Sequence, residues 1–213
     1  MASSYSTDLK LELMVTGENS GTWGDKTNTN LNLIQQAIAG YEAIDVSSGA
    51  TLAMTNANLS NARNAVLKLT GTLTGNVDVT CPDSIEKTYV VQNGTSGAHT
   101  VTFKTVSGTG ATFSTTDKGI KVLFSDGTNV VDVLANASQI NLVNQNEVRF
   151  EDASGGEYVG LKAPTTVSSS VTFALPGADG SSGNGITTDG SGNLSFTDVA
   201  STGKAIAMAI VFG

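Results

Sequence analysis

Residues 9–40 read LKLELMVTGENSGTWGDKTNTNLNLIQQAIAG, and the rest of the chain is organised around this stretch. It runs from alternating leucines, through glycines that surround the chain's one tryptophan, into a segment with helical periodicity. The alternation of Leu9, Leu11 and Leu13 predicts a half-buried strand. Glycine tolerates the positive φ angles of tight turns, so we expect Trp23 to lie on a sharply folded loop.

The second half of this stretch predicts a short helix of about three turns. Its apolar face is formed by Leu31, Ile34 and Ile38. Thr27 or Asn28 is the expected N-cap, and Gly40 is the expected left-handed C-terminal stop. Because an isolated helix this short is marginal in water, its apolar face has to pack against another surface.

Beyond residue 40, the sequence predicts a β domain over residues 41–135. Short runs of β-favouring residues are separated by turn signals such as Asn93-Gly94 and Asp126-Gly127. The predicted strands are Ala65–Leu69, Val77–Cys81, Thr88–Gln92, Thr100–Lys104, Ile120–Phe124 and Asn129–Leu134. Their regular spacing favours an antiparallel sandwich or barrel over a βαβ arrangement, and Asp126-Gly127 marks the clearest hairpin.

Residues 136–213 predict a different architecture. After a polar connector, short alternating segments are separated by turns rich in glycine or serine, and their apolar groups are too sparse for an independent core. Several copies of the chain would form a core by pooling these groups. We therefore expect a mainly β protein with an N-terminal helical module (residues 1–40), the β domain, and an extended, trimeric, intertwined β section (residues 136–213).

Two segments resemble parts of bacteriophage proteins. GENSGTWGDKTNTNLNLIQQAIAG, residues 17–40, resembles a segment (roughly LxLxxxGExxGTWGxxTNxNL) at the start of structural proteins of marine phages, especially cyanophages, where it occurs in tail fibres. LPGADGSSGNGITTDGSGNLSF, residues 175–196, resembles LPxADGxxGQxLxTDGSGxLxW from trimeric fibre shafts. Here Asn184, Ile186 and Phe196 replace the usual Gln, Leu and Trp. The resemblance implies a component of a virion.

Two groups of residues are candidate contacts with virion proteins or with other copies of the chain. The N-terminal group is Trp23, Leu31, Ile34 and Ile38. The C-terminal group lies in the most apolar run of the chain and consists of Ile206, Met208, Ile210 and Phe212. Trp23 has two interpretations that remain open: an anchor that packs on the helix of its own subunit, or a contact with another virion protein.

Composition argues against several classes of partner. The net charge is −8 with a pI near 4.4, whereas nucleic acids and anionic membranes attract clustered Lys and Arg. The longest apolar run is far shorter than the ~20 residues of a membrane span. Cys81 is the only cysteine, so no intramolecular disulfide can form. We expect neither nucleic-acid binding nor membrane insertion.

The sequence offers little for catalysis, and we expect no enzymatic activity, cofactor or metal. His99 is the only histidine, so it has no histidine partner for a metal site. Asp189, Ser191 and Asn193 alternate as oxygen donors, but turn chemistry explains them more simply than calcium binding. Cys81 is expected to be a small buried hydrophobe.

These observations predict a virion structural protein, made in the bacterial cytoplasm and located in the tail rather than the head. The leading hypothesis is a homotrimeric short tail fibre or tail-associated protein that docks on the virion and contributes to host attachment, with a host receptor as a further partner. The alternatives are a capsid decoration or head-fibre protein, and an adaptor between the tail and a longer fibre.

Overall fold

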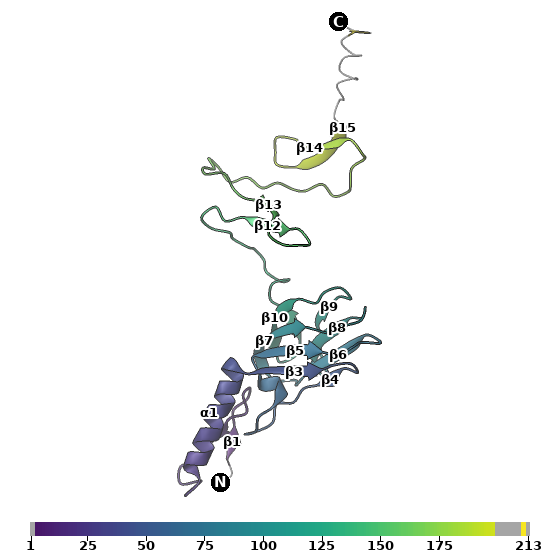
Figure 1. Ribbon diagram of the computed structural model, residues 1–213. Coiled ribbons are helices and arrows are strands. Elements are labelled where there is room, and N and C mark those ends of the chain that lie inside the picture. The colour runs from purple at the N-terminus through teal and green to yellow at the C-terminus, as the bar shows by residue number, and fades with distance from the viewer. Residues whose placement is uncertain (1–2, 199–209, 212–213) are drawn as a thin grey trace. The chain divides into compact units, whose positions relative to one another are not determined.

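The computed structural model describes residues 3–198 and 210–211 and confirms the mainly β class (Figure 1). The chain separates into two compact units, residues 1–140 and 141–213. The N-terminal module belongs to the first unit together with the β domain. Whether residues 1–40, 41–135 and 136–213 fold as three independent parts stays a prediction.

Helix α1 (Trp23–Ala39) is longer than expected and begins at Trp23 itself. The predicted loop position of Trp23 and the predicted cap at Thr27 or Asn28 are therefore wrong. Thr22 occupies the N-cap position without a side-chain hydrogen bond, and the turns needed before the helix fall at Gly17 and Gly21, where φ is +83° and +82°. The glycines before Trp23 make the turn, and the helix starts directly after them.

Gly40 ends α1 in an extended conformation, with φ −69° and ψ 138°, so the predicted left-handed stop is also wrong. The chain continues directly into the next strand. Glycine is required at this position because a Cβ atom would collide with the carbonyl oxygen of Gln36 and the side-chain oxygen of Asn64. Close packing, rather than a positive φ, selects the glycine.

The alternation of Leu9, Leu11 and Leu13 does not form the long strand it predicts. Lys10 has a φ of 54°, which breaks the extended run. Only two short paired strands remain, β1 (Ser4–Tyr5) and β2 (Glu12–Leu13). In β2 the buried residue is Glu12 and the exposed one is Leu13, the reverse of the expected pattern.

Two sheets form the β domain (Figure 1). The five-stranded sheet has the order β11-β10-β7-β5-β3, and the four-stranded sheet has the order β4-β6-β8-β9. The strands of the first sheet are β3 (Tyr41–Asp45), β5 (Val66–Thr70), β7 (Glu86–Asn93), β10 (Ile120–Asp126) and β11 (Val130–Asp132). Those of the second are β4 (Ala50–Thr51), β6 (Val77–Cys81), β8 (Val101–Thr105) and β9 (Gly110–Phe113).

The expected antiparallel sandwich or barrel is wrong for most of this domain. Successive strands alternate between the two sheets, and each pairs in parallel with the strand one turn later. Register partners in the last two turns lie 24 residues apart, as in Val66 with Val90 and Val77 with Val101. The chain thus forms a short coil of parallel turns, as in a β-helix. Antiparallel pairing is limited to β8 with β9, β7 with β10, and β10 with β11 in this domain.

Asn93-Gly94 is a turn signal, but it marks a bend between two parallel turns of the coil and not a hairpin. The same residue types occur in both kinds of turn. Gly94 donates its N–H to the carbonyl oxygen of Leu69, which continues the parallel ladder beyond β7 rather than reversing the chain. Gly71, with φ 109°, lies close to Ser47 of the preceding turn, so a side chain there would collide. At Asp126-Gly127 the predicted hairpin is confirmed, because β10 and β11 pair directly.

The core lies between the two sheets and consists of alternating residues from both. Tyr89 and Phe103 meet there, with ring centroids 5.3 Å apart. Cys81 is fully buried, as predicted. The 3₁₀ helix η1 (Asn61–Arg63) leads into β5 and contributes a buried arginine.

The second unit contains two hairpins. One pairs β12 (Val148–Glu151) with β13 (Tyr158–Leu161), and the other pairs β14 (Asn184–Thr188) with β15 (Leu194–Asp198). All of the residues in β12 and β13 are exposed to solvent.

Candidate interaction surfaces

The outward face of α1 carries the N-terminal candidate residues. Trp23 is 62% exposed, Leu31 57% and Ile38 74%, while Ile34 is half-buried. The inward residue is Leu33, which is 1% exposed. Trp23 is therefore not buried against its own subunit, and the expected apolar face remains open to solvent.

The spacing of the open face matches a helix–helix seam. Leu31, Ile34 and Ile38 follow one another at intervals of three and four residues. This is the spacing of the a and d positions that meet between supercoiled helices. The seam is short, but it gives the face a defined geometry for a helical partner.

Polar residues of the same stretch are used inside the subunit. The side chain of Asn30 accepts from the Glu12 N–H and donates to the Glu12 carbonyl oxygen, both at 2.9 Å, and so pairs like a neighbouring strand. Lys26 Nζ lies 3.0 Å from Glu12 Oε2. This contact, with a hydrogen bond from Ser3, lowers the pKa of the Glu12 carboxyl. These polar contacts hold β1 and β2 against the helix, while Trp23, Leu31 and Ile38 are exposed.

Arg63 joins three parts of the first unit: the segment between β1 and β2, helix α1, and the β domain. No motif in the sequence points to it. The side chain is fully buried and faces no carboxylate in the part of the chain the structure describes. Its Nε donates to the Leu9 carbonyl oxygen at 3.0 Å, and Nη1 donates to Gln36 Oε1 at 3.2 Å. Further bonds reach the carbonyl oxygens of Thr55 and Asn58.

No sequence signal marks Arg63 as special. Its neighbours in NARNAV are ordinary loop and strand residues. Two of its partners, the Leu9 carbonyl oxygen and Gln36 Oε1, are distant in sequence, and the other two are carbonyl oxygens of the loop just before it. Burial lowers the pKa of its guanidinium, as expected for a cation removed from water. The orientation of the N-terminal module depends on a residue that only the folded structure reveals.

The C-terminal candidates are only partly described. Ile210 is 78% exposed. Ile206, Met208 and Phe212 lie outside the described residues, so the structure bears on none of them. The prediction that the apolar run at residues 205–212 forms a contact stays a prediction.

Residues 141–198 bury no side chain, although they are rich in apolar residues. Twelve large hydrophobic side chains are exposed in this section: Leu142, Val143, Val148, Phe150, Tyr158, Val159, Leu161, Val167, Val171, Phe173, Leu175 and Ile186. This section thus exposes many apolar side chains and has no core of its own.

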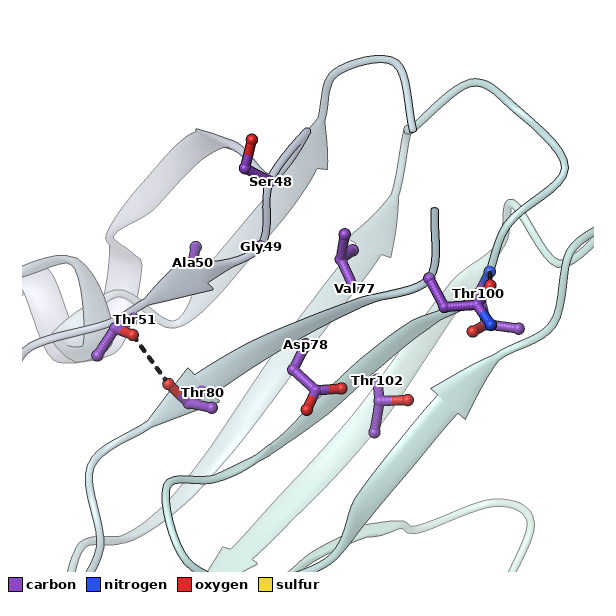
Figure 2. A pocket seen from close by; sticks show the side chains of 10 residues that line it. Ser48, Gly49, Ala50, Thr51, Val77, Asp78, Thr80, Thr100 and Thr102 are labelled. Atoms are coloured by element: carbon purple, nitrogen blue, oxygen red, sulfur yellow. Dashed lines mark hydrogen bonds between the residues drawn. The ribbon is translucent and has the colours of Figure 1, made fainter. Parts of the chain in front are cut away.

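An open depression of about 720 Å³ lies on the outer face of the four-stranded sheet, and Figure 2 shows the side chains that line it. Its floor carries hydroxyl groups, and Thr80 Oγ1 lies 3.4 Å from Thr51 Oγ1. Asp78 is the one carboxylate among its lining residues, whereas hydrolysis of a glycosidic bond ordinarily uses two. The depression offers hydrogen-bonding groups without an acid–base pair.

The remaining polar candidates have structural partners. Asp189 accepts from the N–H of Ser191 at 2.7 Å and from the side chain of Asn193 at 2.6 Å, so its carboxylate organises the turn between β14 and β15. Across the described residues, no group of three or more His, Cys, Asp or Glu side chains is placed to hold a metal ion. Within the same residues, no helix is both long enough and apolar enough to span a membrane.

Comparisons with family models, with curated protein sequences and with solved structures found no match for this chain.

Proposed function

We propose that this chain is a structural protein of a bacteriophage virion, most specifically a short tail fibre or tail-associated protein that functions as a homotrimer. The resemblance of residues 17–40 and 175–196 to phage fibre segments supports the phage assignment. The exposed apolar residues of the second unit support assembly with other copies.

The observation that carries this proposal is the absence of any buried residue from 141–198. In a monomer, the twelve large hydrophobic residues of this section would face water. Side-by-side chains in a fibre would bury them in a shared core, the arrangement expected for an intertwined β section. Static light scattering tests this directly: a mass three times the 21.7 kDa of one chain is expected, and a 21.7 kDa monomer would contradict the trimer.

The open face of α1 supports docking at the N-terminal end. It combines an exposed tryptophan, a residue type common at the energetic centre of interfaces, with a seam of helical spacing. We assign Trp23, Leu31 and Ile38 to the contact with a virion partner. Contribution to host attachment would then fall to the other end of the chain.

Antibody labelling of intact virions tests the location. Gold particles at the tail are the expected result. Labelling of the capsid would assign the chain to the head as a decoration or head-fibre protein. Labelling at the junction between the tail and a longer fibre would assign it as an adaptor.

A further inference from the structure

The outer face of the five-stranded sheet carries an apolar row that crosses every strand. Inward-facing residues such as Leu67 and Val91 are fully buried, and the residues between them point away from the core. Register places the outward residues side by side, and Val133 continues the row by donating its N–H to the Val122 carbonyl oxygen. The row consists of Tyr41, Val66, Val90, Val122 and Val133.

Further apolar side chains widen this row into a continuous surface. Ile120 is 63% exposed and Leu134 66%, and Phe124 lies opposite Val131 in the β10–β11 ladder. We call the row together with these four residues the apolar band. None of its nine members is charged.

The band is large for a surface that faces water. If a fully exposed aromatic side chain presents roughly 150–250 Å² and an aliphatic one somewhat less, the exposed members of the band leave on the order of 500 Å² open. The largest apolar patch on a typical monomer is about 300–600 Å², and each partner in a standard protein interface buries about 800 Å². The band is thus as large as the largest patches of monomers and would form more than half of one side of a stable interface.

The four-stranded sheet provides an internal comparison, because its outer face has the same alternation but a different composition. Its outward side chains are polar: Thr51, Asp78, Thr80, Thr102, Lys104 and Thr112. The five-stranded sheet therefore carries an outward apolar row, flanked on the same face by Asp45, Lys68, Glu86 and Asp126, whereas the strands of the four-stranded sheet carry no such row. This asymmetry is expected of a protomer that turns one face toward its neighbours in a rotationally symmetric assembly.

We propose that the apolar band is the surface through which the β domains of neighbouring copies of this chain pack against one another. In a threefold assembly the band of each chain would face the common axis and contact the bands of the other two copies. The members of the band carry no charge and so add no repulsion between chains of net charge −8, although Asp45, Glu86 and Asp126 lie beside it on the same face. Copies joined through residues 141–198 would also hold their β domains at high effective concentration.

This inference rests on the proposed function in one respect, the presence of several copies. It adds the location of a second interface, in a part of the chain where the phage resemblance indicates none. It also assigns the two faces of the β domain to different surroundings, with the band inside the assembly and the threonine-rich face outside.

Site-specific photo-crosslinking of the full-length protein tests the proposal. A benzoylphenylalanine replaces Phe124 in the band, and in a control protein it replaces Thr112 on the opposite sheet; both positions are exposed. A second band variant carries the probe at Ile120, and circular dichroism checks the fold of all three. We expect covalent dimers and trimers from both band positions, with crosslinked peptides from β3, β5, β7, β10 or β11 of another copy, and at least tenfold less from position 112.

The outcomes separate this inference from the proposed function. An oligomer by light scattering that gives no crosslinks from the band would refute the band as an interface and leave the fibre proposal intact. Crosslinks from the band to a different virion polypeptide would refute the second copy as the occupant. A monomer would overturn both the band interface and the trimer, while virion labelling would still report whether the chain belongs to the particle.

Discussion

Replacing Arg63 with alanine should loosen the attachment of the N-terminal module to the β domain. The guanidinium donates hydrogen bonds to Leu9, Gln36, Thr55 and Asn58, which lie in three separate segments. Hydrogen bonds from a charged group contribute about 1.5–3 kcal/mol each. The substitution would remove the donor of all four bonds, and of the four acceptors Gln36 Oε1 would keep a bond from the Ser60 N–H.

The net loss of stability is smaller than the sum of four hydrogen bonds. The reason is that the folded wild-type protein bears the cost of holding an unpaired cation out of water. Removing that cation recovers part of the desolvation cost, whose physical sign is the lowered pKa of Arg63. We therefore expect Arg63→Ala to lower the free energy of unfolding by about 3–4 kcal/mol, well below the sum of four hydrogen bonds from a charged group.

Urea unfolding followed by circular dichroism at equal chain concentrations provides the measurement. Limited trypsin digestion adds a local readout, because Lys10 and Lys26 lie in the segments that Arg63 secures. The control is Arg149→Ala, whose side chain is 53% exposed and pairs with Glu147 at the surface; exposed pairs contribute about 0–1 kcal/mol. A loss below about 1 kcal/mol for Arg63→Ala, with no faster cleavage at the N-terminal lysines, would refute the role assigned to Arg63.

Three further predictions follow from individual residues. Burial lowers the pKa of Lys87 from 10.5 to about 8. Between pH 8 and pH 10.5 the unfolded chain therefore binds one more proton at Lys87 than the folded chain does, so the stability of the wild type should rise with pH in this range. The stability of Lys87→Met relative to wild type should fall over the same range, and a constant difference would contradict this. Trp23→Ala should leave the urea midpoint unchanged because the side chain is exposed, yet reduce incorporation into virions; equal loss of folding and incorporation would return Trp23 to a role within its own subunit. Burial raises the pKa of Cys81 to about 11, so a thiol reagent at pH 8 should label it only after urea unfolding, and equal labelling rates in the two states would show that the core is open.

The sequence predicted where strands occur better than how they pair. Alternation in Val77–Cys81 located β6 correctly, since a period of two reports which side chains face the core. It does not identify the neighbouring strand. The parallel coil depends on pairs such as β6 with β8. The one trace of this pairing in the sequence is a spacing: β5 and β7 are 24 residues apart, and so are β6 and β8.

The ends of α1 illustrate a second limit. Thr27 and Asn28 are good capping residues by type, but the helix begins before them because Gly17 and Gly21 complete the turn earlier. Gly40 was correctly identified as the helix end, although packing against Gln36 and not a left-handed turn explains it. Local residue preferences therefore located the helix but not its start or its mode of termination.

Among the candidate contacts, the outward position of Leu31 and Ile38 follows the predicted helical face. Arg63 and the apolar band could not be found in the same way. Arg63 depends on carbonyl oxygens from distant segments, and the band depends on cross-strand register, which aligns Tyr41, Val66 and Val90 from separate turns. Neither arrangement leaves a local pattern.

The most direct test of the proposed function is a three-dimensional reconstruction of purified virions from infected cells that produce this chain. Three copies of the chain are expected together at the tail, with the open face of α1 against a tail protein and residues 141–198 in a shared β section. Virions that lack the chain altogether would refute the proposed function.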